Sequence, residues 1–183
     1  LVVDTKIIED PDRTLNMELN REEGTRYYVY SLGALSGIYE DATSAVAQAQ
    51  EENGIVLDTV QRYIWESSNT PDRASISAQD LPEAVAQASL DLTALNEALK
   101  GQGSVIDMTG CTLEQILYEA GAQRPVITKG EDGQTKVILG FDEYNTILYD
   151  PATKETDYYG MQDSTAAFQA NGNVFLCYME DNG

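Results

Sequence analysis

Residues 113–151 read LEQILYEAGAQRPVITKGEDGQTKVILGFDEYNTILYDP, and this stretch decides the fold of the larger part of the chain. Thr112 and Gln115 form the T-x-x-Q capping box that marks the start of a helix, and Gly121 marks its end. The residues that follow form apolar runs separated by turn residues, which predicts antiparallel strands joined by hairpins. We therefore expect one helix followed by strands at 124–130, 135–142 and 145–150.

The sequence on either side completes a body of mixed helices and strands. Residues 172–179 (GNVFLCYM) are apolar, and we expect them to return to the sheet as a fourth strand. Between residues 81 and 99, apolar side chains recur at helical spacing, which predicts one helix, or two helices with Asp91 capping the second. Asp163 is expected to cap a further short helix. The predicted fold class is α+β, with a four-stranded antiparallel sheet.

An earlier segment, residues 25–66, predicts a small separate module. Its order of elements is ββαββ, with two strands before a helix that Asp41 caps and Asn53-Gly54 ends, and two strands after it. The polar residues 67–76 then suit a linker or a long loop. We expect three parts: an N-terminal strand or tether at 1–24, the small module at 25–70, and the larger domain at 71–183.

The element order of residues 113–151, with its PVI strand and its GFD and LYDP elements, resembles the papain-like cysteine peptidases of the bacteriocin-processing type. In that family a histidine lies six residues before the glycine of the G-[YF]-D element. That glycine is Gly140 here, so the place of the histidine falls on Gln134, or on Thr135 if the turn is offset by one. Asp150 falls on the acid that orients the imidazole. The chain contains no histidine, so the resemblance implies a papain-like domain without catalysis.

Cys111 is the one candidate for a nucleophile, because it lies just before the predicted helix, where the macrodipole lowers the pKa of a thiol. In the resembled family, however, the nucleophile lies on a helix further upstream, where this chain has no cysteine. Its general base would have to be a carboxylate or Lys136, which is a poor substitute near neutral pH. We expect Cys111 to be a half-buried structural residue and Cys177 a packed strand residue, and a disulfide between them stays open.

The small module resembles, loosely, the sporulation-related repeat (SPOR) domain, through its YYVYSLG strand, its helix and its return strand. In that family the sheet binds glycan strands of peptidoglycan. An aromatic face that stacks on sugar rings is therefore one reading of the module, and core packing is the other, because successive strand residues point to opposite faces. The candidate binding residues are Tyr28, Tyr30, Tyr39, Tyr63 and Trp65.

Composition narrows the classes of partner. The net charge of −20, from 31 acidic and 11 basic residues, disfavours nucleic acid and anionic lipid, both of which bind through Lys and Arg. No apolar run of about 18 residues predicts a membrane span. Two isolated cysteines without histidine, and no calcium-loop motif, predict no metal site, and we expect no cofactor. The chain begins at Leu1, and we interpret it as a mature or truncated piece of a longer polypeptide.

These observations lead to one main hypothesis and two alternatives. The main hypothesis is a non-catalytic binding or scaffolding domain of an exported Gram-positive surface protein, which binds cell-wall glycan or an extended peptide at a strand edge. The extracellular or envelope location rests on the richness in Tyr, Thr, Asn, Gly and acidic residues. The alternatives are a diverged cysteine peptidase or transferase that uses Cys111, and a purely structural spacer.

Overall fold

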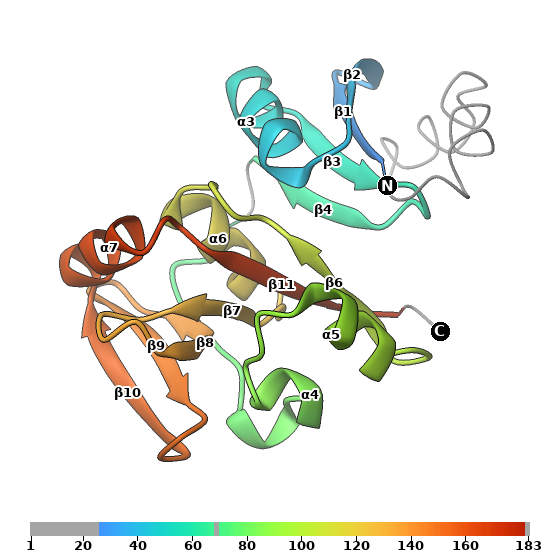
Figure 1. Ribbon diagram of the computed structural model, residues 1–183. Helices are drawn as coiled ribbons and strands as arrows, with labels where there is room; N and C mark the ends of the chain where they lie inside the picture. Colours follow the sequence, from blue (N-terminus) through green and yellow to red (C-terminus); the bar gives the residue numbers. More distant parts are fainter. Residues whose placement is uncertain (1–25, 68–69, 182–183) are drawn as a thin grey trace. The chain divides into compact units, whose positions relative to one another are not determined.

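The computed structural model describes residues 26–67 and 70–181 (Figure 1). The chain divides into two compact units, residues 1–69 and 70–183, and each is described by itself. The predicted tether at 1–24 lies outside the described residues. Among the helices of the described ranges, none is long and apolar enough to cross a membrane.

Unit 1 has the predicted ββαββ order. Its sheet is antiparallel, with the strand order β2-β1-β3-β4. Its elements are β1 (Tyr27–Ser31), β2 (Ala34–Tyr39), α3 (Ala42–Glu52), β3 (Ile55–Asp58) and β4 (Tyr63–Glu66).

Helix α3 begins and ends where its capping residues predict. The Asp41 side chain accepts a hydrogen bond from the backbone N–H of Ser44 at 2.7 Å, which satisfies one of the free N–H groups of the first turn. Asn53 ends the helix in the left-handed conformation, with φ of 52°. Ala42, Ala45 and Ala49 are fully buried, and these small side chains let the helix lie close to the sheet.

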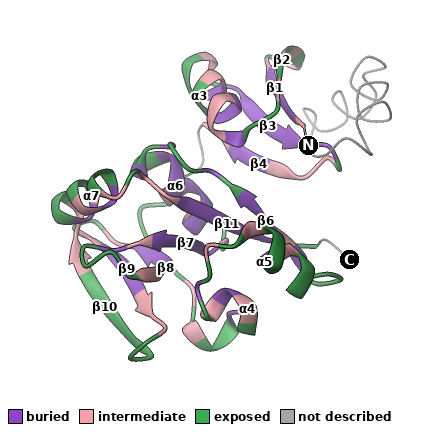
Figure 2. Ribbon diagram, in the orientation of Figure 1, coloured by how far each residue is buried: buried purple, intermediate pink, exposed green. Residues whose placement is uncertain are grey.

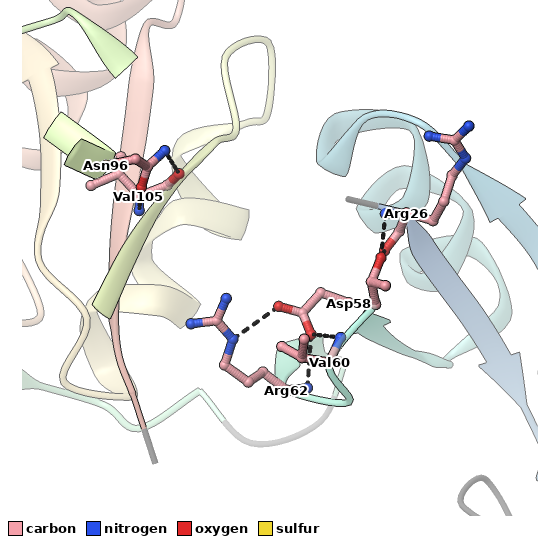
Figure 3. Close-up of polar contacts among 7 residues, drawn as sticks. Arg26, Asp58, Val60, Arg62, Asn96 and Val105 are labelled. Carbon is pink, nitrogen blue, oxygen red and sulfur yellow. Dashed lines mark hydrogen bonds and ion pairs between the residues drawn. The ribbon is translucent and has the colours of Figure 1, made fainter. Parts of the chain in front are cut away.

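The turn between β3 and β4 is fixed by one buried carboxylate. One oxygen of Asp58 accepts hydrogen bonds from the backbone N–H groups of Val60 and Arg62, at 3.0 and 2.9 Å (Figure 3). The other oxygen binds Nε of Arg62 at 3.0 Å. These three contacts hold the turn in one conformation.

Unit 2 is built on a seven-stranded antiparallel sheet. The strand order is β10-β9-β8-β7-β11-β6, and β5 pairs with the end of β8. Its strands are β5 (Ala74–Ser75), β6 (Gly103–Asp107), β7 (Val126–Lys129), β8 (Thr135–Phe141), β9 (Asn145–Asp150), β10 (Glu155–Gly160) and β11 (Phe175–Glu180). Its helices are the 3₁₀ turn η1 (Ala78–Asp80), α4 (Glu83–Ala86), α5 (Leu92–Ala98), α6 (Leu113–Gly121) and α7 (Met161–Ala170).

The α+β class is confirmed, and the sheet is larger than predicted. The four predicted strands are β7, β8, β9 and β11, and they are consecutive in the sheet. Strands β5, β6 and β10 are additional to the four predicted strands. Strand β5 has two residues, and β10 has four exposed residues in a row, so neither carries the apolar alternation of a half-buried strand.

The helix boundaries follow local hydrogen bonds. The Thr112–Gln115 capping box is present, and the alternative of two helices before β6 is correct, with Asp91 accepting from the N–H of Ala94 at 3.0 Å. The prediction that Asp163 caps a helix is wrong. The N-cap is Gly160, three residues earlier, and α7 starts at Met161, because the Met161 N–H extends the β9–β10 ladder to Tyr144 O at 2.7 Å and the chain turns directly from strand into helix.

Helices pack on both faces of the large sheet. On one face, the segment of α4 and α5 forms a buried cluster with alternate strand residues; this cluster includes Val85, Leu95, Leu99, Ile127, Val137 and Leu176. On the opposite face, Phe168 of α7 meets Phe175 of β11 edge-on, with ring centroids 5.8 Å apart. Figure 2 shows that β11, between β7 and the edge strand β6, is mostly buried, whereas β10 at the opposite end of the sheet is largely exposed.

Gly140 has a structural reason to be glycine. Where β5 pairs with β8, a Cβ atom at position 140 would lie 2.0 Å from the carbonyl oxygen of Ala74. The register of β8 with β9 also shifts between Ile138 and Gly140, which marks a bulge. The glycine of the GFD element is therefore required by the close approach of β5.

Candidate functional site

The β8–β9 hairpin carries a lysine–aspartate pair, which includes Asp150, the residue predicted for the orienting acid. Val137 of β8 is opposite Tyr149 of β9, so Lys136 and Asp150 are the next opposed residues. The Lys136 Nζ atom donates to Asp150 Oδ2 at 2.7 Å and lies 3.6 Å from Asp132 Oδ2.

The two charges hold each other ionised. The hydrogen bond from Lys136 lowers the pKa of Asp150, with help from the N–H of Ala152. Burial alone would lower the pKa of Lys136, but the hydrogen bond to Asp150 and the charge of Asp132 outweigh it and raise this pKa. A lysine held protonated has no free electron pair at neutral pH, so Lys136 cannot accept a proton from a thiol.

Gln134, the position predicted for the histidine, lies exposed in the hairpin turn. Its N–H donates to Asp132 Oδ1 at 3.0 Å and its carbonyl oxygen accepts from Gly130 at 2.8 Å. The side chain that reaches Asp150 belongs to Lys136, two residues later. The structure therefore does not bring the side chain of Gln134 to Asp150.

Cys111 is fully buried rather than half-buried, with 1% of its surface exposed. The residue at the N-cap of α6 is Thr112, whose hydroxyl accepts from the N–H of Gln115 at 3.2 Å. Cys111 thus precedes the helix, and its own N–H donates to Met108 O at 3.1 Å. Its burial keeps substrate and solvent from the sulfur atom, which opposes a nucleophilic role.

A buried polar cluster that the sequence did not reveal lies between α6 and β11. Glu119 of α6 has no exposed surface; its Oε2 atom binds Nη1 of Arg124 at 2.9 Å and accepts from the Cys177 thiol at 3.6 Å. The other oxygen, Oε1, has no hydrogen-bond partner in the structure. Burial raises the pKa of Glu119 to about 7, despite the opposing attraction of Arg124.

The two cysteines are both buried free thiols, so the disulfide that the sequence left open is not formed. Burial, together with the nearby Glu119 carboxylate, raises the pKa of Cys177 well above its usual value. A thiol in such surroundings is unreactive. Cys177 is therefore the packed strand residue that its alternation in β11 predicts.

The aromatic residues of unit 1 do not form an exposed face. Tyr28 and Tyr30 are fully buried in one cluster with Ile55 and Leu57, and Trp65 is buried as well. Of the two alternatives, these three residues follow core packing and do not present rings to sugars.

Tyr39 and Tyr63 are half-buried, and the Tyr39 hydroxyl donates to Gln48 Oε1 at 3.2 Å. Over residues 26–67 and 70–181, no group of three or more Cys, Asp or Glu side chains converges in a way that could hold a metal ion.

No protein-family model matches the sequence, and no curated protein matches it. A solved structure that matches is that of a protein from Bacillus anthracis described as a C39-like peptidase, with 14% sequence identity and a TM-score of 0.43. The match covers 50% of this chain and 58% of the length of that protein.

Proposed function

We propose that this chain is a non-catalytic binding domain of an exported Gram-positive surface protein, and that unit 2 holds an extended peptide. The observation that carries this proposal is the Lys136–Asp150 ion pair, with its 2.7 Å contact. We take Asp150 as the counterpart of the orienting acid of a papain-like peptidase, and the side chain that binds it here is that of Lys136, not an imidazole. Asp150 is bound to Lys136 and therefore does not orient an imidazole as the acid of a peptidase does.

The surroundings of Cys111 also argue against cysteine peptidase activity. An attacking cysteine must reach substrate and must lose its proton to a base. Cys111 is buried, and Lys136, the basic side chain that contacts Asp150, is held protonated. A diverged peptidase or transferase that uses Cys111 is therefore the weaker alternative.

A peptide is a better partner than cell-wall glycan for the described surface. Sugar rings bind on exposed aromatic side chains, and three of the five candidate aromatic residues of unit 1 are buried. A net charge of −20 further opposes nucleic acid and anionic lipid. No metal or other cofactor is needed for such binding, and an extracellular location fits the composition of the chain.

The proposal is tested by exposing the immobilised full chain to a randomised mixture of octapeptides and, separately, to Gram-positive sacculi. We expect the chain to retain a subset of the peptides intact and to stay in the supernatant when the sacculi are pelleted at high salt. Pelleting with sacculi without peptide retention would instead favour glycan binding by unit 1. Retention of neither would leave the spacer alternative.

A further inference from the structure

Strand β10 is an open edge of the large sheet. It is the last strand in the sheet order and pairs through six consecutive residues with β9, without a bulge. The Met161 N–H donates to Tyr144 O in line with this ladder, at 2.7 Å. Because antiparallel residues alternate between bonded and non-bonded pairs, Thr156 and Tyr158 direct their N–H and C=O groups away from β9. Both residues are exposed, and within the described chain no hydrogen bond reaches these outward groups.

The opposite edge of the same sheet is closed. There, Asn96 of α5 pairs with the backbone of Val105 in β6 in the manner of a neighbouring strand (Figure 3). The Val105 N–H donates to Asn96 Oδ1 at 2.7 Å, and Asn96 Nδ2 donates to Val105 O at 3.2 Å. The Gly103 N–H donates to Leu99 O at 3.1 Å. Proteins protect edge strands in this way against unwanted pairing, and among residues 26–67 and 70–181 no such cover lies on β10.

The edges of the small sheet in unit 1 are also less suitable. The pairing of β1 with β2 shifts register between Val29 and Tyr30, and that of β3 with β4 shifts between Val56 and Leu57. Such bulges twist an edge and interrupt its regular row of donors and acceptors. Among the edge strands that the structure describes, β10 therefore offers the longest regular template.

The side chains of β10 select the charge of a partner. Glu155 and Asp157 are exposed on one face of the strand, and Thr156 and Tyr158 lie on the other, with Tyr158 63% exposed. No ion pair engages Glu155 or Asp157 in the described structure. Pairing of two copies through β10 would bring these acids together, in chains that each carry a charge of −20. Charge repulsion therefore disfavours pairing with a second copy, and charge attraction favours pairing with a cationic strand.

We propose that β10 is the edge on which the partner peptide adds a further strand, and that this peptide alternates basic and apolar residues. Its basic side chains lie beside Glu155 and Asp157, and its apolar side chains lie beside Tyr158. Its backbone completes the hydrogen bonds of Thr156 and Tyr158, which is the mode of β-strand addition. This inference rests on the proposed function and adds to it the place of binding and the class of peptide.

The test uses the full chain and a capped synthetic peptide of four Lys-Val repeats. Two matched peptides serve as controls. One has the same composition arranged as a Lys block followed by a Val block, and the other is methylated on alternate backbone nitrogens on its pairing edge. Affinity is measured by titration at low salt, and hydrogen exchange is followed at the amides of Thr156 and Tyr158. We expect the alternating peptide to bind and to protect these two amides, and both control peptides to bind at least about tenfold more weakly.

A matched pair of variants locates the site. The double variant Glu155→Lys/Asp157→Lys changes the acids of β10, and Glu83→Lys/Glu97→Lys changes two exposed acids on α4 and α5. Both variants have a net charge of −16, from −20 plus two changes of +2 each. We expect the β10 variant to lose about tenfold in affinity and the control variant to stay within about twofold of wild type.

Two results would overturn the inference while the proposed function stands. In one, the Lys-Val peptide does not bind, although other octapeptides of the random mixture are retained. In the other, it binds, but the two double variants weaken it equally or the amides of β10 exchange as before. If the chain retains no peptide of any sequence, the proposed function itself fails.

Discussion

The buried carboxylate of Glu119 gives the sharpest prediction, because it should make the stability of unit 2 fall as the pH rises through neutrality. Burial raises its pKa to about 7 in the folded chain, from 4.5 for an exposed glutamate. The folded state therefore keeps a proton that the unfolded state has already lost between these two values. Wherever the folded state binds more protons, the free energy of unfolding decreases with increasing pH.

The size of the effect follows from the difference between the two pKa values. It corresponds to about 3 kcal/mol in total, of which about 2 kcal/mol is lost between about pH 5.5 and about pH 8. The chain contains no histidine, the side chain whose unperturbed pKa falls within this range. The replacement Glu119→Gln removes the titrating group and should flatten the dependence on pH.

Urea unfolding at a series of pH values measures this effect. Far-UV circular dichroism reports both units, and the fluorescence of Trp65 reports unit 1 alone, which separates the contribution of unit 2. For wild type we expect the midpoint of unit 2 to fall as the pH rises, and for Glu119→Gln we expect it to stay nearly constant.

A constant wild-type midpoint would refute the reasoning. It would show that the 2.9 Å contact with Arg124 outweighs burial and keeps Glu119 ionised in the folded chain throughout this range. A midpoint that rises with pH would refute it as well, since the sign would then be that of a carboxylate with a lowered pKa.

Three further predictions concern local contacts. The thiol of Cys111 should react with iodoacetamide only as fast as the chain unfolds, and rapid labelling at neutral pH would favour the peptidase alternative. The variant Asn96→Ala should lower the stability of unit 2 by about 1–2 kcal/mol in urea, because both hydrogen bonds to Val105 are lost; an unchanged midpoint would show that water replaces them. The variant Asp58→Ala should lower the stability of unit 1 by about 3 kcal/mol, because Arg62 Nε and two backbone N–H groups lose their contacts with this carboxylate, and tryptophan fluorescence would detect it; a loss below about 0.5 kcal/mol would contradict the role of this turn.

Local signals in the sequence predicted much of the fold. The caps at Asp41, Asp91 and Thr112 depend on a few neighbouring residues, and each forms the predicted hydrogen bond. The four central strands of unit 2 were predicted because a buried strand must be apolar. Strand β10 escaped prediction for the opposite reason, since an edge strand needs no apolar alternation and its residues read as a polar loop.

The candidate site was predicted less well, because its features depend on contacts between distant residues. Counting residues from Gly140 led to Gln134, but the register across the hairpin brings Lys136 to Asp150. Glu119 was not among the candidate site residues, yet it is more buried than its neighbour Leu117. Its burial depends on the packing of α6 against β11, which brings Glu119 to Cys177. The sequence alone does not show this packing.

The aromatic residues of unit 1 show a similar limit. Alternation along a strand predicts that Tyr28 and Tyr30 share a face, and they do share one buried cluster. It does not say whether that face is covered, which is what separates a sugar-binding surface from a core.

The most direct test of the central claim is a search for cleavage. The full chain, at a concentration equal to that of the substrate, would be incubated with the random octapeptide mixture from about pH 6 to about pH 9, and new peptide termini would be sought by mass spectrometry. If the Lys136–Asp150 pair and the buried Cys111 exclude thiol chemistry, no new termini appear at any pH. New termini that are absent with the Cys111→Ser variant would contradict the account and establish a cysteine peptidase.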